Sequence, residues 1–302
     1  MTPALDKTSS PDATRRAGWK VWTLFSPLLG WLLLFVVAPT LILAVYSFFH
    51  YDGNSQVTPG FTLEHYRAAL SGVYLYNFFV SSLYAGGTTI LCALIGYPVA
   101  YFIGRSSPGT RNRLLMLVMI PFLTSFLIRT FAWVAILNQN GVLNKLLRFV
   151  HLIPGVLGNN FEILYSRSAV MIALVYTYLP FMILPIYGSV EKLDQSLIEA
   201  ASDLGASPLK AFRRVILPLT LPGISAGALM VFVPAVAMFA VTHVMSGGKI
   251  QLIGDKIEDQ FLGEAGNIPF GSALGMVLLI AFIVTFYLFT RRAEGAEAGA
   301  LG

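Results

Sequence analysis

The side chains that commonly perform catalysis or hold metal ions are few and scattered in this sequence. Its four histidines stand at positions 50, 65, 151 and 243, and its single cysteine, Cys92, lies within an apolar segment. No group of His, Cys and carboxylate residues has the spacing of a zinc site. No glycine-rich loop ends in Gly-Lys followed by Ser or Thr, the signature of a nucleotide-phosphate loop. We therefore expect no active site, no ATPase site, no metal and no cofactor in this chain.

The most informative spacing lies in the segment Glu191–Gly223. An apolar stripe recurs there at helical intervals, formed by Leu193, Leu197, Ala201 and Leu204. Glu199 and Asp203 fall on the opposite side of the same helix. Gly205 stands where a helix C-cap needs a left-handed residue, and Ser207-Pro208 has the pattern of an N-cap and a first helical residue.

The second helix of this segment is expected to be short and basic. It carries Lys210, Arg213 and Arg214, and Pro218 and Pro222 are expected to end it. The whole segment is thus predicted to form a helix–turn–helix, with the apolar stripe packed against the rest of the chain and an acidic end facing water or a partner. From the residues alone, this segment could either cover the end of the helix bundle or bind a partner protein.

Composition indicates that this segment belongs to a membrane protein. The 302 residues are 56% hydrophobic and 12% charged, whereas a soluble chain has about 25% charged residues. Long stretches lack Asp, Glu, Lys and Arg entirely, and each accommodates the roughly 20 apolar residues of a membrane-spanning helix. The net charge of +5 comes from cations at the ends of these stretches, which favours membrane lipid over nucleic acid as a partner.

Six spanning helices are predicted, and the fold class is all-α integral membrane protein. Their expected bounds are about Trp19–Phe49, Tyr76–Gly104, Leu114–Leu137, Ala169–Val190, Ile224–Met245 and Phe270–Thr290. Prolines at 98, 121, 180, 185 and 234 fall inside them, as in transporters whose helices bend around a pathway. After the break at Asn140-Gly141, a short amphipathic helix is expected at the membrane interface. Residues 1–18 and 293–302 are expected to be polar tails of one domain, 19–292.

The distribution of cations predicts the orientation. With the N-terminus in the cytoplasm, thirteen of the 20 Lys and Arg residues fall in cytoplasmic segments and six in external ones, with Arg129 inside a helix. The positive-inside rule therefore places both termini, and the segment 191–223, in the cytoplasm.

The residue sequence of that segment resembles a known motif. Glu199-Ala200-Ala201, followed by Gly205 and then by Leu217-Pro218, is similar to the EAA loop of permease subunits of binding-protein-dependent ABC importers. Val215 stands where the family has Ile. Through this resemblance, an ATPase is expected to contact Glu199, Ala200, Ala201, Asp203, Gly205, Leu217 and Pro218.

From Leu114 to about Ala281 the chain is most similar to the permeases of spermidine/putrescine importers. The resemblance is carried by Phe126–Trp133, Asn140–Leu147, Tyr176–Asp194 and Ile268–Ala273. It implies the six-helix, MetI-like fold of type I importers in a bacterial inner membrane. The implied partners are a second related permease chain, two ATPase subunits that bind ATP and Mg, and a periplasmic or external solute-binding protein.

A solute pathway has several candidate residues. Arg129 is the one full charge within a predicted span, and such a residue is expected to face a cavity, a partner or water; solute contact and a structural role both stay open. The other candidates lie on the fourth and fifth spans: Tyr176, Tyr178, Met238, Phe239, Thr242 and His243. Aromatic faces attract ammonium groups, and packing or interface anchoring is the alternative for the tyrosines.

The segment Met238–His243 departs from the polyamine relatives, which often carry a carboxylate there. Negative charge for a polycation would then come from the partner permease or from outer-loop acids: Asp52, Asp255, Glu258, Asp259 and Glu264. Another amine, an opine, an amino acid derivative or an organophosphonate is the alternative cargo. Three other classes of protein fit less well. This chain lacks the set of catalytic residues that a membrane enzyme needs, and a secondary transporter would carry more ionisable residues in its spans. The helix–turn–helix counts against a receptor or scaffold.

Overall fold

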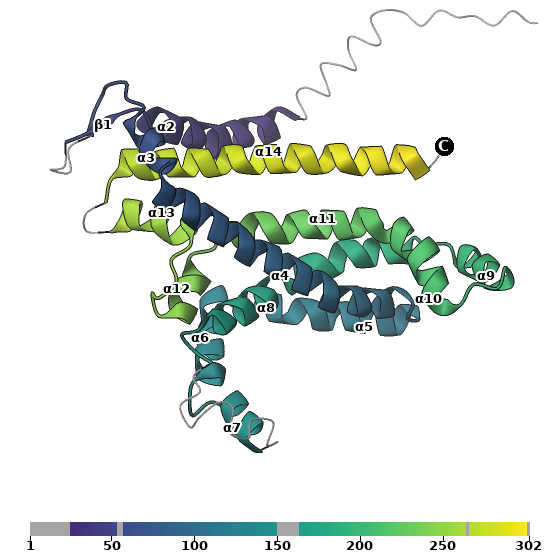
Figure 1. Cartoon of the computed structure of the whole chain (residues 1–302). Coiled ribbons are helices and arrows are strands. Elements are labelled where there is room, and N and C mark those ends of the chain that lie inside the picture. Colours follow the sequence, from purple (N-terminus) through teal and green to yellow (C-terminus); the bar gives the residue numbers. More distant parts are fainter. Residues whose placement is uncertain (1–24, 53–56, 150–162, 264–265, 301–302) are drawn as a thin grey trace, which may run out of the picture.

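The computed structural model describes residues 25–52, 57–149, 163–263 and 266–300. These residues are almost entirely helical (Figure 1). Two short strands, β1 (His50–Tyr51) and β2 (Val57–Thr58), pair antiparallel, with His50 opposite Thr58 and Tyr51 opposite Val57. The sequence prediction of an all-α membrane protein is confirmed.

Five helices are long and apolar enough to cross a membrane, and a bent pair makes a sixth. The first spans Phe25–Tyr46 and contains the π-helical turn η1 (Leu33–Val37) and α2 (Ala38–Tyr46). After α3 (Glu64–Ala69) come α4 (Gly72–Gly104) and, further along, α8 (Arg167–Glu191). The fourth of these five helices comprises α10 (Pro208–Ala211), the π-helical turn η3 (Phe212–Ile216) and α11 (Leu217–Val236), and the fifth is the apolar part of α14 (Ile268–Ala300).

The core of the bundle is formed by α4, α8 and α11, which pack on one another. Small residues allow close approach: a Cβ added at Gly223 of α11 would lie 2.6 Å from the Pro185 carbonyl oxygen of α8. Fully buried side chains at the centre include Leu174, Met182, Ile186 and Val231. By contrast, α14 packs mainly on α2, α3 and α13 (Ile253–Leu262), so it lies beside the core with α2 (Figure 1).

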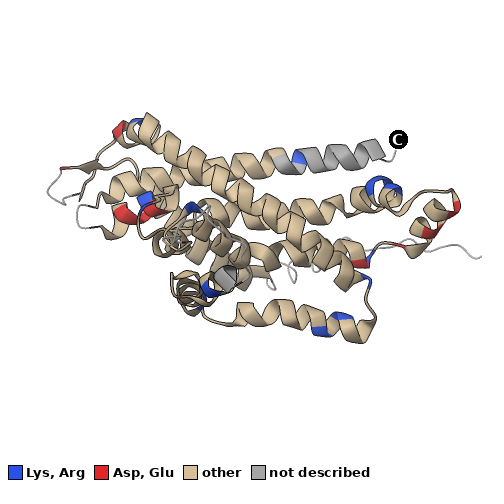
Figure 2. Cartoon of the chain, turned by 60° about the horizontal axis from the view of Figure 1, so that its bottom comes forward, with Lys and Arg blue, Asp and Glu red and all other residues tan. Residues whose placement is uncertain are grey.

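Lys, Arg, Asp and Glu residues lie mainly toward the two ends of the bundle in the described part of the chain (Figure 2). One end carries α9 (Gln195–Asp203), α10 and the end of α14. The other end carries β1, α13 and α12 (Ala240–Ser246) (Figure 1). This arrangement fits a protein whose helices cross a membrane and whose ends meet water.

The expected third span, Leu114–Leu137, is not one straight helix. It consists of α5 (Pro108–Met119), the 3-10 turn η2 (Ile120–Leu123) and α6 (Phe126–Leu137), and the chain bends by 92° at the break. Pro121 removes a backbone donor in the last turn, and Thr124 adopts an extended conformation with ψ 151°. The Thr124 hydroxyl donates to the Pro121 carbonyl at 2.7 Å, which satisfies an acceptor that the helix end leaves free. The short helix expected after Asn140-Gly141 is present as α7 (Val142–Phe149).

The expected fifth span, Ile224–Met245, is wrong at both ends. Pro218 and Pro222 lie inside a helix that begins at Pro208, and they do not end it. A proline removes one donor and bends a helix, and packing against α4 and α8 keeps this one continuous. The helix stops at Val236, shortly after Pro234, and the chain then forms the separate helix α12.

The other spans follow the sequence closely. The fourth, expected at Ala169–Val190, is observed at Arg167–Glu191, and the second ends at Gly104 as expected. The last helix continues to Ala300, beyond the expected Thr290. The first six residues of the first expected span, and the tail 1–18, lie outside the described residues.

Candidate functional site

The segment between α8 and α11 forms the predicted helix–turn–helix. The Asp194 carboxylate caps α9 by accepting from the Ser196 backbone N–H at 2.9 Å, and this bond lowers the pKa of Asp194. Gly205 has a φ of +78°, the left-handed conformation that glycine adopts without steric cost. Ser207 then precedes Pro208, the first residue of α10. We call residues Lys192–Ala211 the α9–α10 loop.

The apolar stripe of this loop is only partly covered, contrary to the expectation that it packs on the rest of the chain. Leu193 and Ala201 are half-buried, but Leu204 is 89% exposed and Leu197 45%. Leu209 of the second helix is 59% exposed. The reason is that α9 projects past the end of the bundle (Figure 1) and packs mainly on α10 and η3. Glu199, Ala200 and Asp203 are exposed on the same short helix. Exposed leucines rimmed by charges are typical of a surface that a partner covers.

Two arginines lie near the start of this loop: Arg105, at the end of α4, contacts the loop itself, and Arg111 of α5 pairs with Glu191, the residue just before the loop. Arg105 Nη1 donates to Gln195 Oε1 at 2.7 Å, and Arg111 Nη1 lies 2.7 Å from Glu191 Oε1. The Nε and Nη2 atoms of Arg105 are buried without a hydrogen-bond partner. In the sequence, both arginines served only to predict the orientation in the membrane. Their contacts could not be predicted, because their partners lie 90 and 80 positions away.

The far side of the loop is anchored by packing. Ala211 and Ile216 are buried, and the Phe212 ring meets the Tyr97 ring edge-on with centroids 5.5 Å apart. The Tyr97 hydroxyl lies 2.9 Å from the Thr220 hydroxyl oxygen. Leu217 is half-buried and Pro218 is exposed at the start of α11. These contacts attach the end of the α9–α10 loop to α4 and to the start of α11.

The predicted pathway residues do not form one cluster. Arg129 lies on α6, its guanidinium carbon 5.1 Å from the centroid of the Phe122 ring, and its Nε is buried without a partner. Tyr176 meets Trp133 of α6 edge-on with ring centroids 5.2 Å apart. Tyr178 is only 4% exposed and belongs to the core.

The remaining candidates lie at the break between α11 and α12. Thr242 is fully buried and its hydroxyl is 3.1 Å from the Met238 carbonyl oxygen and 2.7 Å from that of Phe239. Phe239 is 40% exposed, and His243 is exposed. The break therefore presents Phe239 and His243 outward and holds Thr242 inward.

A carboxylate that sequence reasoning named only as one outer-loop acid lies against Thr242. Asp255 is 2% exposed; its Oδ2 accepts from the Thr242 hydroxyl at 3.0 Å and from the Leu252 N–H at 2.8 Å. Burial raises the pKa of the Asp255 carboxyl above its ordinary value of 3.8, while those hydrogen bonds and the nearby His243 act in the opposite direction. The neighbouring Ile253 N–H donates to Ser81 Oγ of α4 at 2.8 Å. A carboxylate thus lies beside the segment Met238–His243, supplied by α13.

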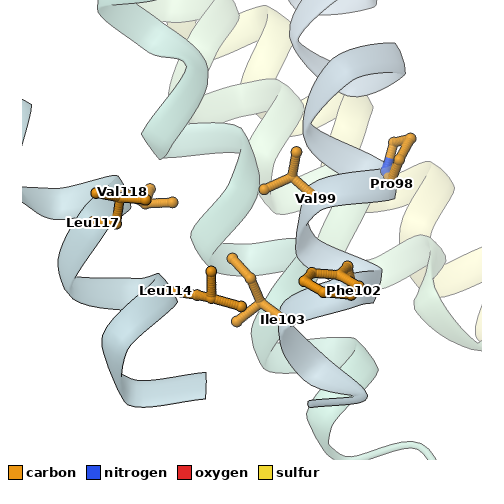
Figure 3. A pocket seen from close by; sticks show the side chains of 7 residues that line it. All are labelled: Pro98, Val99, Phe102, Ile103, Leu114, Leu117 and Val118. Carbon is orange, nitrogen blue, oxygen red and sulfur yellow. The ribbon is translucent and has the colours of Figure 1, made fainter. Parts of the chain in front are cut away.

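A separate groove between α4 and α5 has an entirely apolar lining. It measures about 330 Å³ and is lined by Pro98, Val99, Phe102, Ile103, Leu114, Leu117 and Val118 (Figure 3). A cation would lose its hydration there without any compensating partner, so the groove suits apolar chains rather than a charged solute. Within the described ranges, no three His, Cys, Asp or Glu side chains come together as a metal site.

Comparison with known families identifies the architecture. Residues 96–294 match the profile of the family described as binding-protein-dependent transport system inner membrane component. The chain belongs to this family. It is therefore a multi-pass inner-membrane transport subunit, and the match contains η3, α11 and the α9–α10 loop.

Comparison with individual proteins supports the same family assignment. It is 42% identical over 260 residues to the spermidine/putrescine transport system permease protein PotB of Haemophilus influenzae, covering 85% of this chain and 89% of that one. It is 41% identical to the protein of the same name from Escherichia coli, covering 87% and 94%. A crystal structure of a bacterial ABC transporter involved in alginate import superimposes with a TM-score of 0.67 at 18% identity, covering 91% of this chain and 96% of that one. The last comparison shows the shared fold.

Proposed function

We propose that this permease forms half of the translocation pathway of an ATP-driven importer for a polyamine, spermidine or putrescine. The observation that carries the proposal is the 41–42% identity to two spermidine/putrescine permeases over 85% or more of this chain. A second, related permease chain would supply the other half. Two separate ATPase subunits would bind ATP and Mg, and a periplasmic solute-binding protein would deliver the cargo.

The proposed ATPase contact is the α9–α10 loop. Its exposed leucines provide apolar area that a cleft on a partner can bury, and Glu199 and Asp203 add charge at the rim. The hydrogen bond of Arg105 with Gln195 connects it to the end of α4, and Phe212, the residue after the loop, packs against Tyr97 of α4 and leads into α11. When the ATPase subunits close on ATP, each would pull such a loop and rock its six-helix bundle between outward-open and inward-open states.

The proposed orientation has both termini and the α9–α10 loop in the cytoplasm. The count of cations favours it, and the end of α14 lies at the same end of the bundle as α9 and α10 (Figure 1). Fusing a reporter that fluoresces only in the cytoplasm to the C-terminus tests it. Fluorescence is the expected result, and activity of a periplasm-only reporter at the same position would contradict it.

The polyamine cargo is supported chemically by the site at α12. Asp255, buried in this conformation, places a carboxylate beside Thr242 in the segment that otherwise lacks one. Phe239 at the break and Tyr176 of α8 offer partly exposed rings for ammonium groups. The cationic Arg129 would stay in its contact with Phe122 as a structural residue of the bend.

The test is a solute screen on the complete transporter in liposomes. With its solute-binding protein present, spermidine or putrescine is expected to stimulate ATP hydrolysis. Stimulation by another amine, an opine, an amino acid derivative or an organophosphonate, with none from either polyamine, would overturn the cargo assignment. ATP-independent uptake by this chain alone would instead overturn the ATP-driven mechanism and indicate a secondary transporter.

A further inference from the structure

A second cavity, of about 930 Å³, lies where the first half of α4, the start of α8 and Gly248–Gln251 meet. Its wall contains cationic and apolar residues, together with uncharged polar ones such as Asn77, Ser168 and Gln251. Arg167 and Lys249 are cationic, while Val80, Leu83, Met171 and Ile172 form an apolar side. Among the described residues that line it, none is Asp or Glu. The cavity includes none of the residues proposed for the solute pathway or for the ATPase contact.

Local backbone structure fixes the positions of Arg167 and Lys249 at the cavity. Arg167 is the first residue of α8. Lys249 follows Gly247 and Gly248, whose φ angles of +60° and +76° turn the chain, and its Nζ lies 5.8 Å from the centroid of the Tyr165 ring. Within the described part of the chain, the one ion pair is that of Arg111 with Glu191, so neither cation is paired with an acid among those residues.

The cations and the apolar side lie at different depths. At 1.5 Å per residue, Met171 and Ile172 lie roughly 6–8 Å further along α8 than Arg167. Val80 and Leu83 line the same cavity from α4. A ligand seated here would therefore place an anionic group at the end of the spanning helix and an apolar chain alongside it. The N-terminus of α8 adds a favourable dipole for the anion.

We propose that this cavity binds an acidic phospholipid, with its phosphate between Arg167 and Lys249 and an acyl chain against Val80, Leu83 and Met171. Basic pockets between spanning helices bind lipid headgroups in this way. A free inorganic anion would leave the apolar side uncovered, and a polyamine would be repelled by the two cations. The proposed orientation places the lipid in the outer leaflet, but the binding itself does not depend on that orientation.

The test counts lipids on the intact purified transporter by native mass spectrometry after exchange with phosphatidylglycerol or phosphatidylethanolamine. The unmodified protein is expected to retain phosphatidylglycerol preferentially. The double variant R167Q/K249Q should bind it on the order of tenfold more weakly, whereas R167K/K249R should retain it. Arg67→Gln removes an exposed cation of α3 outside the cavity and is the matched control.

Three results would overturn the proposal. The first is equal retention of phosphatidylglycerol by R167Q/K249Q and the unmodified protein, with both eluting as intact assemblies. The second is displacement of the lipid by inorganic phosphate, which would mean that the apolar side contributes nothing. The third is a cross-link from Leu83→Cys to the second permease chain, because a partner would then fill the cavity. None of these readouts uses transport, so they leave the proposed cargo untouched.

Discussion

Arg111 Nη1 lies 2.7 Å from Glu191 Oε1, and this ion pair joins the start of α5 to the last residue of α8. Together with the Arg105–Gln195 hydrogen bond, it holds the α9–α10 loop to a second helix of the bundle. The loop is thus attached at its start while Leu197 and Leu204 of its apolar stripe stay exposed. A device that transmits force needs this combination of a free contact surface and a rigid attachment.

Exchanging the two charges of this pair tests the attachment. Because the side chains are 24% and 40% exposed, the pair should contribute no more than about 1 kcal/mol to stability. Arg111→Glu alone is expected to raise the ATP hydrolysed per solute transported, and the exchange R111E/E191R should restore the ratio. Arg113→Ala, which removes a neighbouring exposed cation, is the control. A ratio unchanged in R111E would mean that the pair plays no part in coupling.

Gly205→Val is expected to uncouple ATP hydrolysis from uptake while the chain still inserts. No atom lies within 4 Å of a Cβ added at Gly205, so the effect comes from the left-handed backbone alone, at about 1–2 kcal/mol. Gly205→Asn should be tolerated, since Asn adopts this conformation more readily. Gly109→Val, also in open space but within α5, controls for the added side chain. Normal uptake by an inserted Gly205→Val protein would contradict the role of the loop.

Leu204→Ser should weaken ATPase binding without disturbing the permease. Burying a leucine is worth about 1.5–3 kcal/mol, so affinity should fall roughly tenfold to a hundredfold in a pull-down titration with the purified ATPase. Leu262→Ser, at a residue 76% exposed on α13 at the opposite end of the bundle, should have no effect. Equal loss in both variants would point to general destabilisation instead.

Gly223→Leu is expected to destabilise the bundle. Even a Cβ at Gly223 would lie 2.4 Å from Ser189 Oγ and 2.6 Å from the Pro185 carbonyl oxygen, so α11 would have to move away from α8, at about 1–3 kcal/mol or more. Gly188→Leu, where no atom lies within 4 Å of an added Cβ, is the matched control. Thermal unfolding in detergent gives the comparison, and equal midpoints for the two variants would show that the contact is not tight.

The buried Asp255 predicts an unusual pH dependence. Its pKa is raised above 3.8 mainly by burial, so the folded state binds this proton more tightly than the unfolded state. The stability contributed by this group should therefore increase as pH falls through the raised pKa, and the cost of the buried charge is fully present above it. Asp255→Asn should flatten this part of the dependence, measured as unfolding midpoints from pH 4 to 8. A difference between the two proteins that does not change with pH would contradict it.

Sequence patterns predicted those features that depend on neighbouring residues. The left-handed Gly205, the start of α10 at Ser207-Pro208 and the bounds of α8 were confirmed because each depends on local backbone chemistry. The bend at Thr124 and the shifted fifth span could not be predicted, because a proline in an apolar run is compatible with a kink, a break or a continuous helix, and packing decides between them.

Contacts between distant residues explain the other differences. An amphipathic stripe such as Leu197 and Leu204 shows that a face will be covered, but not whether the cover is the protein's own bundle or a partner. Asp255 and Thr242 are separated by a turn, so no periodic sequence pattern links them. Gln195 and Arg105 are 90 positions apart in the sequence. Both contacts could be identified only from the three-dimensional structure.

Uptake of labelled spermidine by proteoliposomes tests the central claim most directly. The vesicles hold this permease with its partner permease and ATPase subunits, with the solute-binding protein outside and ATP inside. We predict that spermidine or putrescine accumulates only when ATP and the binding protein are both present, and that Gly205→Val abolishes this accumulation. Accumulation without ATP, or no accumulation of either polyamine while another amine is concentrated under the same conditions, would contradict the account.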